Sequence, residues 1–254
     1  MRSDDVARSF GFKAALVPGV TVFAHMTHPL VERFGEAWLA RGTAEVNFAK
    51  PAYEGDMLSV ETVEDGAAHP AQLSVVCRIE EGAELARLTT AAPSGAVRSP
   101  DSRAAIRPAP PIEERPLVTW DLMEVGKPFP ALAWRPTQAD NLQWCADVCD
   151  DLPTYRGGDA SLLHPGFVLR QANMVLRNRF TLPAWIHTGS RIVFHHALLA
   201  GQSYEVRAIP EEKWNRKGHE FVRLYVAILG TAEVMAEVIH TAIFRPRPAE
   251  SHSA

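Results

Sequence analysis

The stretch HPGFVLRQANMVLRNRF, from His164 to Phe180, decides how we expect this chain to fold. Pro165 and Gly166 stand where a helix would begin, so the first free backbone N–H groups and the positive end of the helix dipole would face whatever lies in front of Gly166. Such a helix start can hold an oxyanion, and an ordinary helix start is the alternative interpretation. The apolar residues recur at intervals of three and four, which predicts a broad apolar face; they are Val168, Leu169, Ala172, Val175, Leu176 and Phe180.

The composition limits the class of protein. The 254 residues carry a formal net charge of -4, which gives no electrostatic support for binding to nucleic acid. No segment approaches the run of about 20 apolar residues that crosses a membrane, and the first residues lack the apolar core of a signal peptide. We therefore expect no nucleic acid partner, no membrane association and a cytoplasmic location.

The cysteines indicate neither disulfides nor a metal. Three cysteines, Cys77, Cys145 and Cys149, are too few for a disulfide framework and suit a reducing compartment. Cys145 and Cys149 stand four residues apart on a predicted helix, close enough for a metal pair, but no second ligand pair follows at a suitable spacing. We expect both to be small buried apolar residues and predict no metal site.

An internal repeat links the two halves of the chain. Pro18 and Gly19 match Pro165 and Gly166 at an offset of 147 residues (165 − 18 = 147). Each half then shows the same order, a turn, a long amphipathic helix and several short apolar runs, which predicts a duplicated fold unit. The further matches, with one residue deleted after Gly42, pair Gly42 with Gly189, Phe48 with Phe194 and Gly55 with Gly201.

The short runs, rich in Val, Ile, Leu, Phe and Thr, predict strands. In the first half a helix over 20–34 precedes them, and Pro29 should kink or end that helix. The predicted strands cover residues 43–48, 57–63, 72–79 and 85–92 in the first half, and 190–194, 204–209, 221–228 and 234–244 in the second.

The pattern predicts an α+β fold of two curved antiparallel sheets, each wrapped around a central helix. The two sheets should join edge to edge, since this removes an exposed edge from each. Between them, residues 93–116 hold six prolines and no apolar period, which predicts a linker along the surface. We therefore predict an N-terminal domain over 1–95, a linker over 96–118 and a C-terminal domain over 119–247.

The segment before the organising helix resembles a known signature. Residues 137–149 are helix-like, with Thr137 as a cap, and they lead into DDLPTY over residues 150–155. Asp150 and Tyr155, with Pro153 between them, resemble the Asp-x-Asn-Pro-x-His signature of the MaoC-like (R)-specific enoyl-CoA hydratases and acyl dehydratases. HPGF over 164–167 stands at the family's His-Gly turn, and ARSFGF over 7–12 resembles its Ala-Arg-x-x-Gly-Phe run. The resemblance extends from residue 6 to about residue 247, linker excluded, and implies a double hot-dog fold.

The resemblance also implies roles for these residues. In the family, the aspartate and histidine of the signature handle the water and its protons, so Asp150 would position or activate water. The Gly166 amide would polarise the thioester carbonyl. Tyr155 stands at the histidine position, where a phenol with an ordinary pKa of about 10 donates a hydrogen bond but is a poor base. His164 is a candidate substitute for that histidine. The alternative is that Asp150 ends a helix and Tyr155 packs beneath it.

Other polar residues give weaker signals. His187 lies in a predicted helix-to-strand connection, which in the resembled family lies near the substrate tunnel, and a surface loop is an equally good interpretation. His195 and His196 follow a predicted strand, so one should point inward and one outward. Arg191, Arg245 and Arg247 are candidates for contacts to the phosphates of a coenzyme A or carrier-protein arm, or are solvated surface residues; the histidines expected to be structural are His25, His28, His219 and His240.

The function implied by the resemblance is the addition or removal of water at the β-carbon of an acyl-CoA or acyl-carrier-protein thioester, without a metal or other cofactor. In the first half Pro18 stands at the histidine of the turn, so this half should be a non-catalytic shell for the acyl chain. Two further functions stay open: a non-catalytic thioester-binding protein or partner subunit of an active hydratase, and a hot-dog thioesterase. The chain is compatible with a homodimer.

Overall fold

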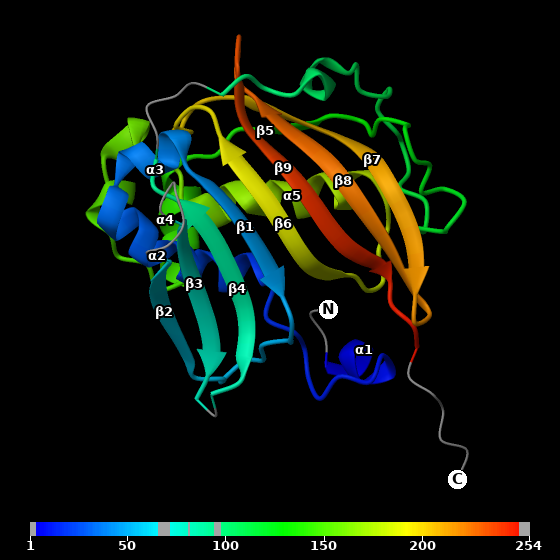
Figure 1. Cartoon of the computed structure of the whole chain (residues 1–254). Helices are drawn as coiled ribbons and strands as arrows, with labels where there is room; N and C mark the ends of the chain where they lie inside the picture. Colours follow the sequence, from blue (N-terminus) through cyan, green and yellow to red (C-terminus); the bar gives the residue numbers. More distant parts are fainter. Residues whose placement is uncertain (1–3, 66–71, 81, 94–97, 249–254) are drawn as a thin grey trace.

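One nine-stranded antiparallel sheet dominates the computed structural model, which describes residues 4–65, 72–80, 82–93 and 98–248 (Figure 1). The strand order across the sheet is β2-β3-β4-β1-β6-β9-β8-β7-β5. The strands are β1 (Thr43–Phe48), β2 (Leu58–Asp65), β3 (Gln72–Ile79), β4 (Glu84–Ala91), β5 (Leu132–Trp134), β6 (Ile186–Phe194), β7 (Tyr204–Arg216), β8 (His219–Leu229) and β9 (Val234–Arg245).

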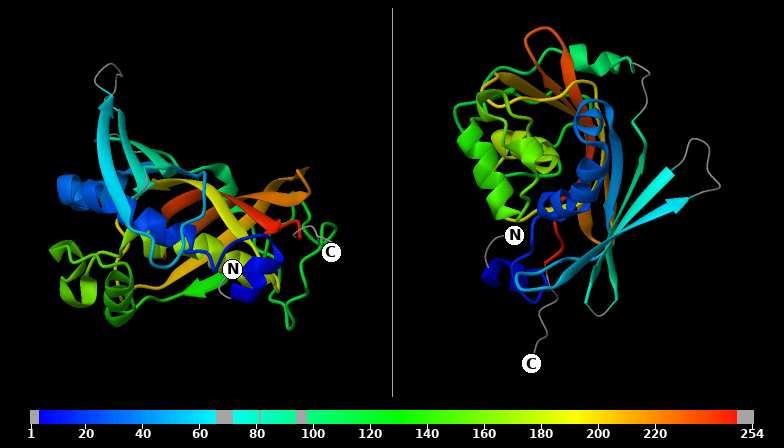
Figure 2. Two further views of the ribbon diagram at one scale, coloured as in Figure 1. Left: turned by 90° about the horizontal axis from the view of Figure 1, so that it is seen from below. Right: turned by 90° about the vertical axis from the view of Figure 1, so that its left-hand side faces the viewer.

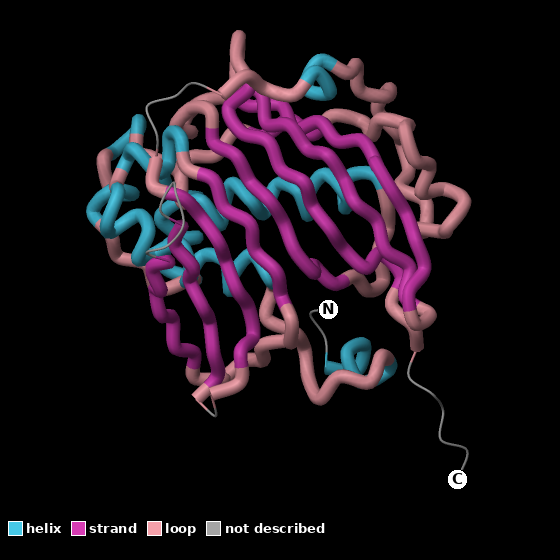
Figure 3. Tube along the Cα trace, viewed as in Figure 1, coloured by secondary structure: helices cyan, strands magenta, loops and turns pink. Residues whose placement is uncertain are grey.

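The two long helices, α2 (Gly19–Phe34) and α5 (Pro165–Arg179), lie against the same face of the sheet and contact each other (Figures 2 and 3). The predicted apolar face is confirmed, because none of its six residues, five on α5 and Phe180 directly after it, is more than 1% exposed. Together with the inward side chains of the strands they form one continuous core. The shorter helices are α1 (Asp4–Ser9), α3 (Glu36–Arg41) and α4 (Gln138–Asp147), with 3-10 turns η1 (Ser102–Ala105), η2 (Pro153–Tyr155) and η3 (Gly158–Ala160).

The predicted edge-to-edge join of the two halves is confirmed. β1 pairs antiparallel with β6, from Thr43 opposite Val193 to Asn47 opposite Gly189. On either side of this join the strands follow the same order, β1-β4-β3-β2 in one direction and β6-β9-β8-β7 in the other. The repeat in the sequence is therefore a repeat in the strand order. The chain builds one continuous sheet, not two separate ones.

Several boundaries differ from the prediction. Pro29 does not end α2, which runs on to Phe34 because Leu30 and Val31 beyond the proline are buried in the core. β6 begins at Ile186, so His187 lies in a strand and not in a connection, and the strand ends before His195. β7 continues past Pro210 through a register shift, and β5 was not predicted. The predicted domain boundary at residue 95 lies outside the described residues.

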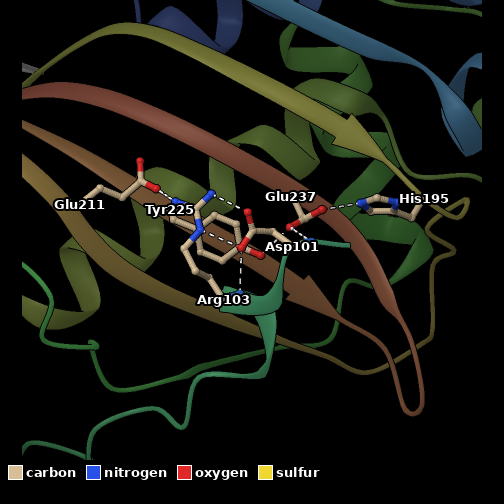
Figure 4. A network of polar contacts seen from close by, with 6 residues as sticks. All are labelled: Asp101, Arg103, His195, Glu211, Tyr225 and Glu237. Carbon is tan, nitrogen blue, oxygen red and sulfur yellow. Dashed lines mark hydrogen bonds and ion pairs between the residues drawn. The ribbon is translucent and has the colours of Figure 1, made fainter. Parts of the chain in front are cut away.

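The part of the linker around η1 lies on the face of the sheet opposite to α5, whereas its end pairs through Leu117 with Thr181, just after α5. η1 contacts β8, and Ala104 packs with Tyr225 and Ala227 in a small cluster separate from the main core. A polar network fastens it, as Figure 4 shows. Glu237 accepts hydrogen bonds from the Asp101 amide at 2.9 Å and from the Tyr225 hydroxyl at 2.5 Å, and it lies 2.6 Å from His195 Nε2.

Arg103 completes this network. Its guanidinium makes two 2.8 Å hydrogen bonds to Asp101, pairs with Glu211 and lies 4.3 Å from the centroid of the Tyr225 ring. Burial alone would raise the pKa of Glu237, but the hydrogen bonds from His195, Tyr225 and the Asp101 amide outweigh it and the pKa lies below its ordinary value. The charge of Glu237 therefore holds the linker to the sheet.

We expect the substitution Glu237→Gln to lower the free energy of unfolding by about 2 kcal/mol, because hydrogen bonds to a buried charge are lost. Glu212→Gln is the matched control. Glu212 pairs with Arg223, but its side chain is 51% exposed, so its loss should cost less than about 1 kcal/mol. Urea unfolding of both variants measures the difference, and equal losses would contradict this role of Glu237.

Candidate functional site

The end of α4 places Asp150. The predicted cap is confirmed, because Thr137 accepts a hydrogen bond from the Asp140 amide and Asp140 returns one. At the other end Cys149 adopts a left-handed backbone with a φ of 53°, a common way for a helix C-terminus to reverse the chain. The Asp150 amide then donates to the Cys145 carbonyl at 2.9 Å. Cys145 is buried as expected, but Cys149 is exposed, because this turn points outward.

Asp150 lies between two histidines and is 5% exposed. Its Oδ2 lies 3.2 Å from His164 Nε2, and its Oδ1 lies 3.1 Å from His28 Nδ1 and accepts the Leu152 amide at 3.1 Å. Burial alone would raise the pKa of the Asp150 carboxyl, but the hydrogen bonds from His164 and from the Leu152 amide outweigh it, so the pKa lies below its ordinary value. Asp150 is a carboxylate with both oxygens engaged.

His164 is fully buried and uses both of its ring nitrogens. Its Nδ1 accepts hydrogen bonds from the Gly166 amide at 3.0 Å and from the Trp144 indole at 3.2 Å. Two N–H groups directed at one nitrogen require a lone pair there, so the ring proton is on Nε2, toward Asp150. Burial lowers the pKa of His164 despite the opposing effect of Asp150. His164 is therefore a neutral cap of α5.

The Gly166 amide does not have the free position that we expected. His164 already accepts it, and the amides of Phe167 and Val168 donate to the His164 carbonyl. A Cβ atom on Gly166 would lie 2.8 Å from the Cβ atom of Ala24. The start of α5 therefore packs against α2, and glycine is needed there for close approach of the two helices.

Tyr155 packs against His164, with 4.8 Å between the ring centroids, and has no exposed surface. Its hydroxyl has no hydrogen-bond partner among the described residues, and burial raises its pKa above the ordinary value. This position matches the alternative in which Tyr155 packs beneath the signature.

A cavity of about 550 Å³ lies beside this cluster, between the start of α2, the middle of α5, the end of α4 and the start of β6. Asp150, Tyr155, His164 and Gly166 do not line it, whereas His187 does. The predicted site residues thus lie in two places: four form a buried cluster, and His187 lines the cavity. Apolar side chains form much of the wall, among them Leu16, Val17, Val22, Met174, Trp185 and Ile186.

The start of α2 lines the cavity with Pro18, Gly19 and Val20. The Val17 amide donates to the Ala52 carbonyl at 2.9 Å, and the Thr21 amide donates to the Pro18 carbonyl at 2.8 Å. Among the described residues, no side chain caps this helix. The amides of Gly19 and Val20 therefore keep the unsatisfied state of a helix N-terminus.

His187 lies next to this helix start. A β-bulge between His187 and Gly189 shifts the register with β9, so that His187 and Ser190, three residues apart, both face inward. His187 Nε2 lies 2.8 Å from Ser190 Oγ, which lies 3.0 Å from His240 Nδ1. Burial, and after it the neighbouring His240, hold the pKa of His187 well below its ordinary value. Burial lowers the pKa of His240 to about 3.

Two buried polar atoms of cavity residues have no partner among the described residues, His187 Nδ1 and Asn173 Oδ1. Asn173 is on α5 and is 8% exposed. Buried polar atoms in proteins are nearly always hydrogen-bonded, so these two atoms indicate a polar ligand or water. The basic residues that line the cavity are Lys50, Arg170 and Arg177.

Sequence reasoning missed four residues of these two clusters. His28 could have been found from helix geometry, because Val20, Ala24 and His28 follow one face of α2 at intervals of four. Ser190 and His240 are opposite each other in the β6–β9 register, which the sequence did not reveal. Asn173 stands beside the apolar face of α5, and the apolar period gives no sign of a separate role for it.

The other candidates, apart from His195 with its buried side chain, have surface positions. Arg245 pairs with Glu220, and His219 accepts the Arg247 amide at the edge of the cavity. Arg191 is exposed on β6. His195 pairs with Glu237 and His196 with Glu233. Within the described ranges, no three His, Cys, Asp or Glu side chains are grouped to hold a metal ion, and none of the helices described there has the length and apolarity to cross a membrane.

Comparison with known proteins supports the fold alone. No family model matches the chain, and no curated protein matches it. A protein from Chloroflexus aurantiacus J-10-fl, described as a MaoC domain dehydratase, superposes with a TM-score of 0.68 at 14% identity, over 96% of this chain and 86% of that one. A conserved hypothetical protein from Mycobacterium tuberculosis with a double hot-dog fold superposes with a TM-score of 0.64 at 13% identity, over 95% of this chain and 86% of that one.

A structure from Novosphingobium aromaticivorans DSM 12444, described as a thioesterase, gives a TM-score of 0.52 at 14% identity, over 91% of this chain and 88% of that one. The resemblance to MaoC-like proteins is thus confirmed for the fold: the chain is a double hot-dog. Because dehydratases and thioesterases share this fold, the reaction has to be argued from the site.

Stability should fall as the pH drops below about 6.5, the unfolded value for histidine. The pKa values of His164, His187 and His240 are lowered in the fold, so the unfolded chain binds protons that the folded chain does not. His240, whose pKa is about 3 in the fold, should alone cost about 2 kcal/mol at pH 5. Urea unfolding from pH 7.5 to 5 measures the slope. The dependence of unfolding free energy on pH should become shallower in His240→Gln and stay unchanged in His196→Gln. Equal slopes in both variants would contradict a role of His240 in this dependence.

Cys149→Gly should stabilise the protein by about 1 kcal/mol, because glycine adopts the left-handed backbone without the cost of a Cβ atom. Thermal and urea unfolding measure the gain. Cys149→Ala, which keeps the Cβ atom, is the matched control and should leave stability close to that of the natural chain. The expectation fails if glycine is no more stable than alanine at this position.

Proposed function

We propose that this chain binds an acyl thioester in the cavity beside α2 and adds or removes water at its β-carbon. In hydration the water oxygen forms a bond to the β-carbon of a 2-enoyl group, a proton goes to the α-carbon and the double bond is lost. Dehydration of the 3-hydroxyacyl group is the reverse. The reaction is redox-neutral, so the atoms balance without an oxidant or reductant.

The observation that carries this proposal is the combination of surfaces in the cavity. Apolar walls suit an acyl chain, while the unsatisfied start of α2, His187 Nδ1 and Asn173 Oδ1 suit a carbonyl oxygen and a water. Ligand sites commonly pair such apolar walls with a few converging polar groups. A volume of about 550 Å³ accommodates a thioester group with a short or medium acyl chain.

The charges around the cavity suit the carrier of the acyl group. Lys50, Arg170 and Arg177 contribute positive charge to its lining, and Asp147 is the carboxylate among the lining residues. Arginine and lysine bind phosphate groups, which both coenzyme A and the arm of an acyl carrier protein contain. The proposed partner is therefore an acyl-CoA or acyl-carrier-protein thioester.

We assign Asp150 and His164 to holding the start of α5, not to the reaction. Their polar atoms bind one another, His28, Trp144 and the Gly166 amide, and they do not line the cavity. Because the polar atoms of Asp150 and His164 are bonded within the protein, a second function is also favoured, in which the chain binds a thioester without turnover or acts as partner of an active subunit. Thioester hydrolysis is the third outcome that the experiment separates.

The test is a panel of short, long and aromatic 2-enoyl-CoA thioesters, with loss of the conjugated double bond and release of free thiol followed in parallel. We expect double-bond loss without thiol release. Thiol release would show a thioesterase, and binding without either change would show a non-catalytic protein; each result would overturn the hydratase assignment.

Met174→Trp tests the place of the acyl group. Met174 lines the cavity on α5, so the larger ring should reduce kcat/KM at least tenfold for the longest acyl chains that the natural protein accepts, because their space is filled. Met57→Trp, at a side chain that is 68% exposed, is the matched control and should not alter turnover. Unchanged kcat/KM in Met174→Trp would place the acyl group elsewhere.

A further inference from the structure

The two matching helix starts differ in one decisive respect. The offset of 147 residues pairs His164 with Val17 (164 − 147 = 17). His164 Nδ1 accepts the Gly166 amide and closes the start of α5. Val17 has no acceptor in its side chain, and no side chain of the described ranges caps α2. One helix start is therefore closed by the protein itself, and the other is open to the cavity.

His187 supplies a second polar group at the open start. His187 is 7% exposed, and its Nδ1 has no hydrogen-bond partner in the part of the chain that the structure describes. A Cβ atom on Gly19 would lie 2.9 Å from this nitrogen. The Phe48 ring at 4.8 Å and the His240 ring at 4.4 Å pack against the imidazole, so its orientation is fixed before a ligand arrives.

Ser190 and His240 couple the proton position of His187 to a chain of hydrogen bonds. Ser190 Oγ lies within hydrogen-bond distance of both rings and has one hydrogen to donate. When it accepts the Nδ1 proton of His240, it donates to Nε2 of His187. A neutral His187 then carries its proton on Nδ1, beside Gly19. The low pKa of both histidines keeps them neutral.

We propose that the start of α2 is an oxyanion hole, in which the amides of Gly19 and Val20 and the Nδ1–H of neutral His187 donate to the thioester carbonyl oxygen. The inference rests on the proposed function and places the reacting end of the substrate in the N-terminal half, not at Gly166. Donors fixed in advance stabilise the negative charge that the oxygen gains as water adds to the β-carbon. Ser190 and His240 are positioning residues.

Binding of a thioester that cannot react tests this site apart from the reaction. The probe is hexanoyl-CoA with ¹³C at the thioester carbonyl, which has no double bond to hydrate. Isotope-edited infrared spectroscopy of the complex reports the carbonyl stretch. Three donors should move it to lower wavenumber than in water, because hydrogen bonds to the oxygen weaken the double bond.

The variants assign the donors. His187→Phe should lose part of the infrared shift, and His187→Gln, whose amide can donate, should restore some of it. Ser190→Ala should reduce the shift, because His187 is no longer held in the tautomer with its proton on Nδ1. Gly19→Ala should abolish the shift, since the new Cβ atom meets His187. Tyr155→Phe, in the other cluster, is the matched control with an unchanged shift. On enoyl-CoA, loss of one donor should lower kcat by about 10² to 10³.

The outcomes separate the two proposals. An infrared shift that depends on His187 and Gly19 supports the oxyanion hole even when no hydration is seen. A shift that survives His187→Phe and Gly19→Ala, or a bound thioester without any shift, overturns the oxyanion hole and leaves the cavity as the binding site. Absence of hexanoyl-CoA binding to the natural chain overturns both. Unfolding curves of each variant confirm that it is folded.

Discussion

The antiparallel pairing of β1 with β6 is the constraint on which the rest of the structure depends. It fuses the two half-sheets into one, and it requires glycine at residue 189, where a Cβ atom would lie 2.9 Å from the Val46 carbonyl oxygen. Since both halves then share one sheet, their long helices share one face and must pack against each other. The contact of Gly166 with Ala24 and Val20 is a result of that packing.

This arrangement gives the two helix starts different surroundings. The start of α5 is buried, and burial of unsatisfied amides is costly, so His164 satisfies them and Asp150 holds His164 in place. The start of α2 lies against a cavity, where a ligand or water can satisfy its amides. A histidine that resembles a catalytic residue in sequence thus acts as a helix cap in the structure.

Much of the fold could be predicted because the periodic spacing of apolar residues and the presence of turn residues are local signals in the sequence. The six residues of the predicted apolar face, on α5 and at its end, are all buried, and the strand over 43–48 was predicted with its observed bounds. The site was harder, because its contacts join residues far apart in sequence. Asp150 meets His28 across 122 residues (150 − 28 = 122), and a bulge sets the direction of His187. Neither the distant contact nor the bulge leaves a periodic pattern in the sequence.

Fusion of the two halves in one polypeptide frees each helix start to change separately. In a homodimer of single hot-dog subunits the two helix starts are copies of one sequence, so a histidine that caps one also caps the other. Here Val17 and His164 are encoded independently. The start of α5 can therefore be capped and rigid while the start of α2 keeps unpaired amides for a ligand. Duplication followed by divergence thus removes a conflict that symmetry would impose.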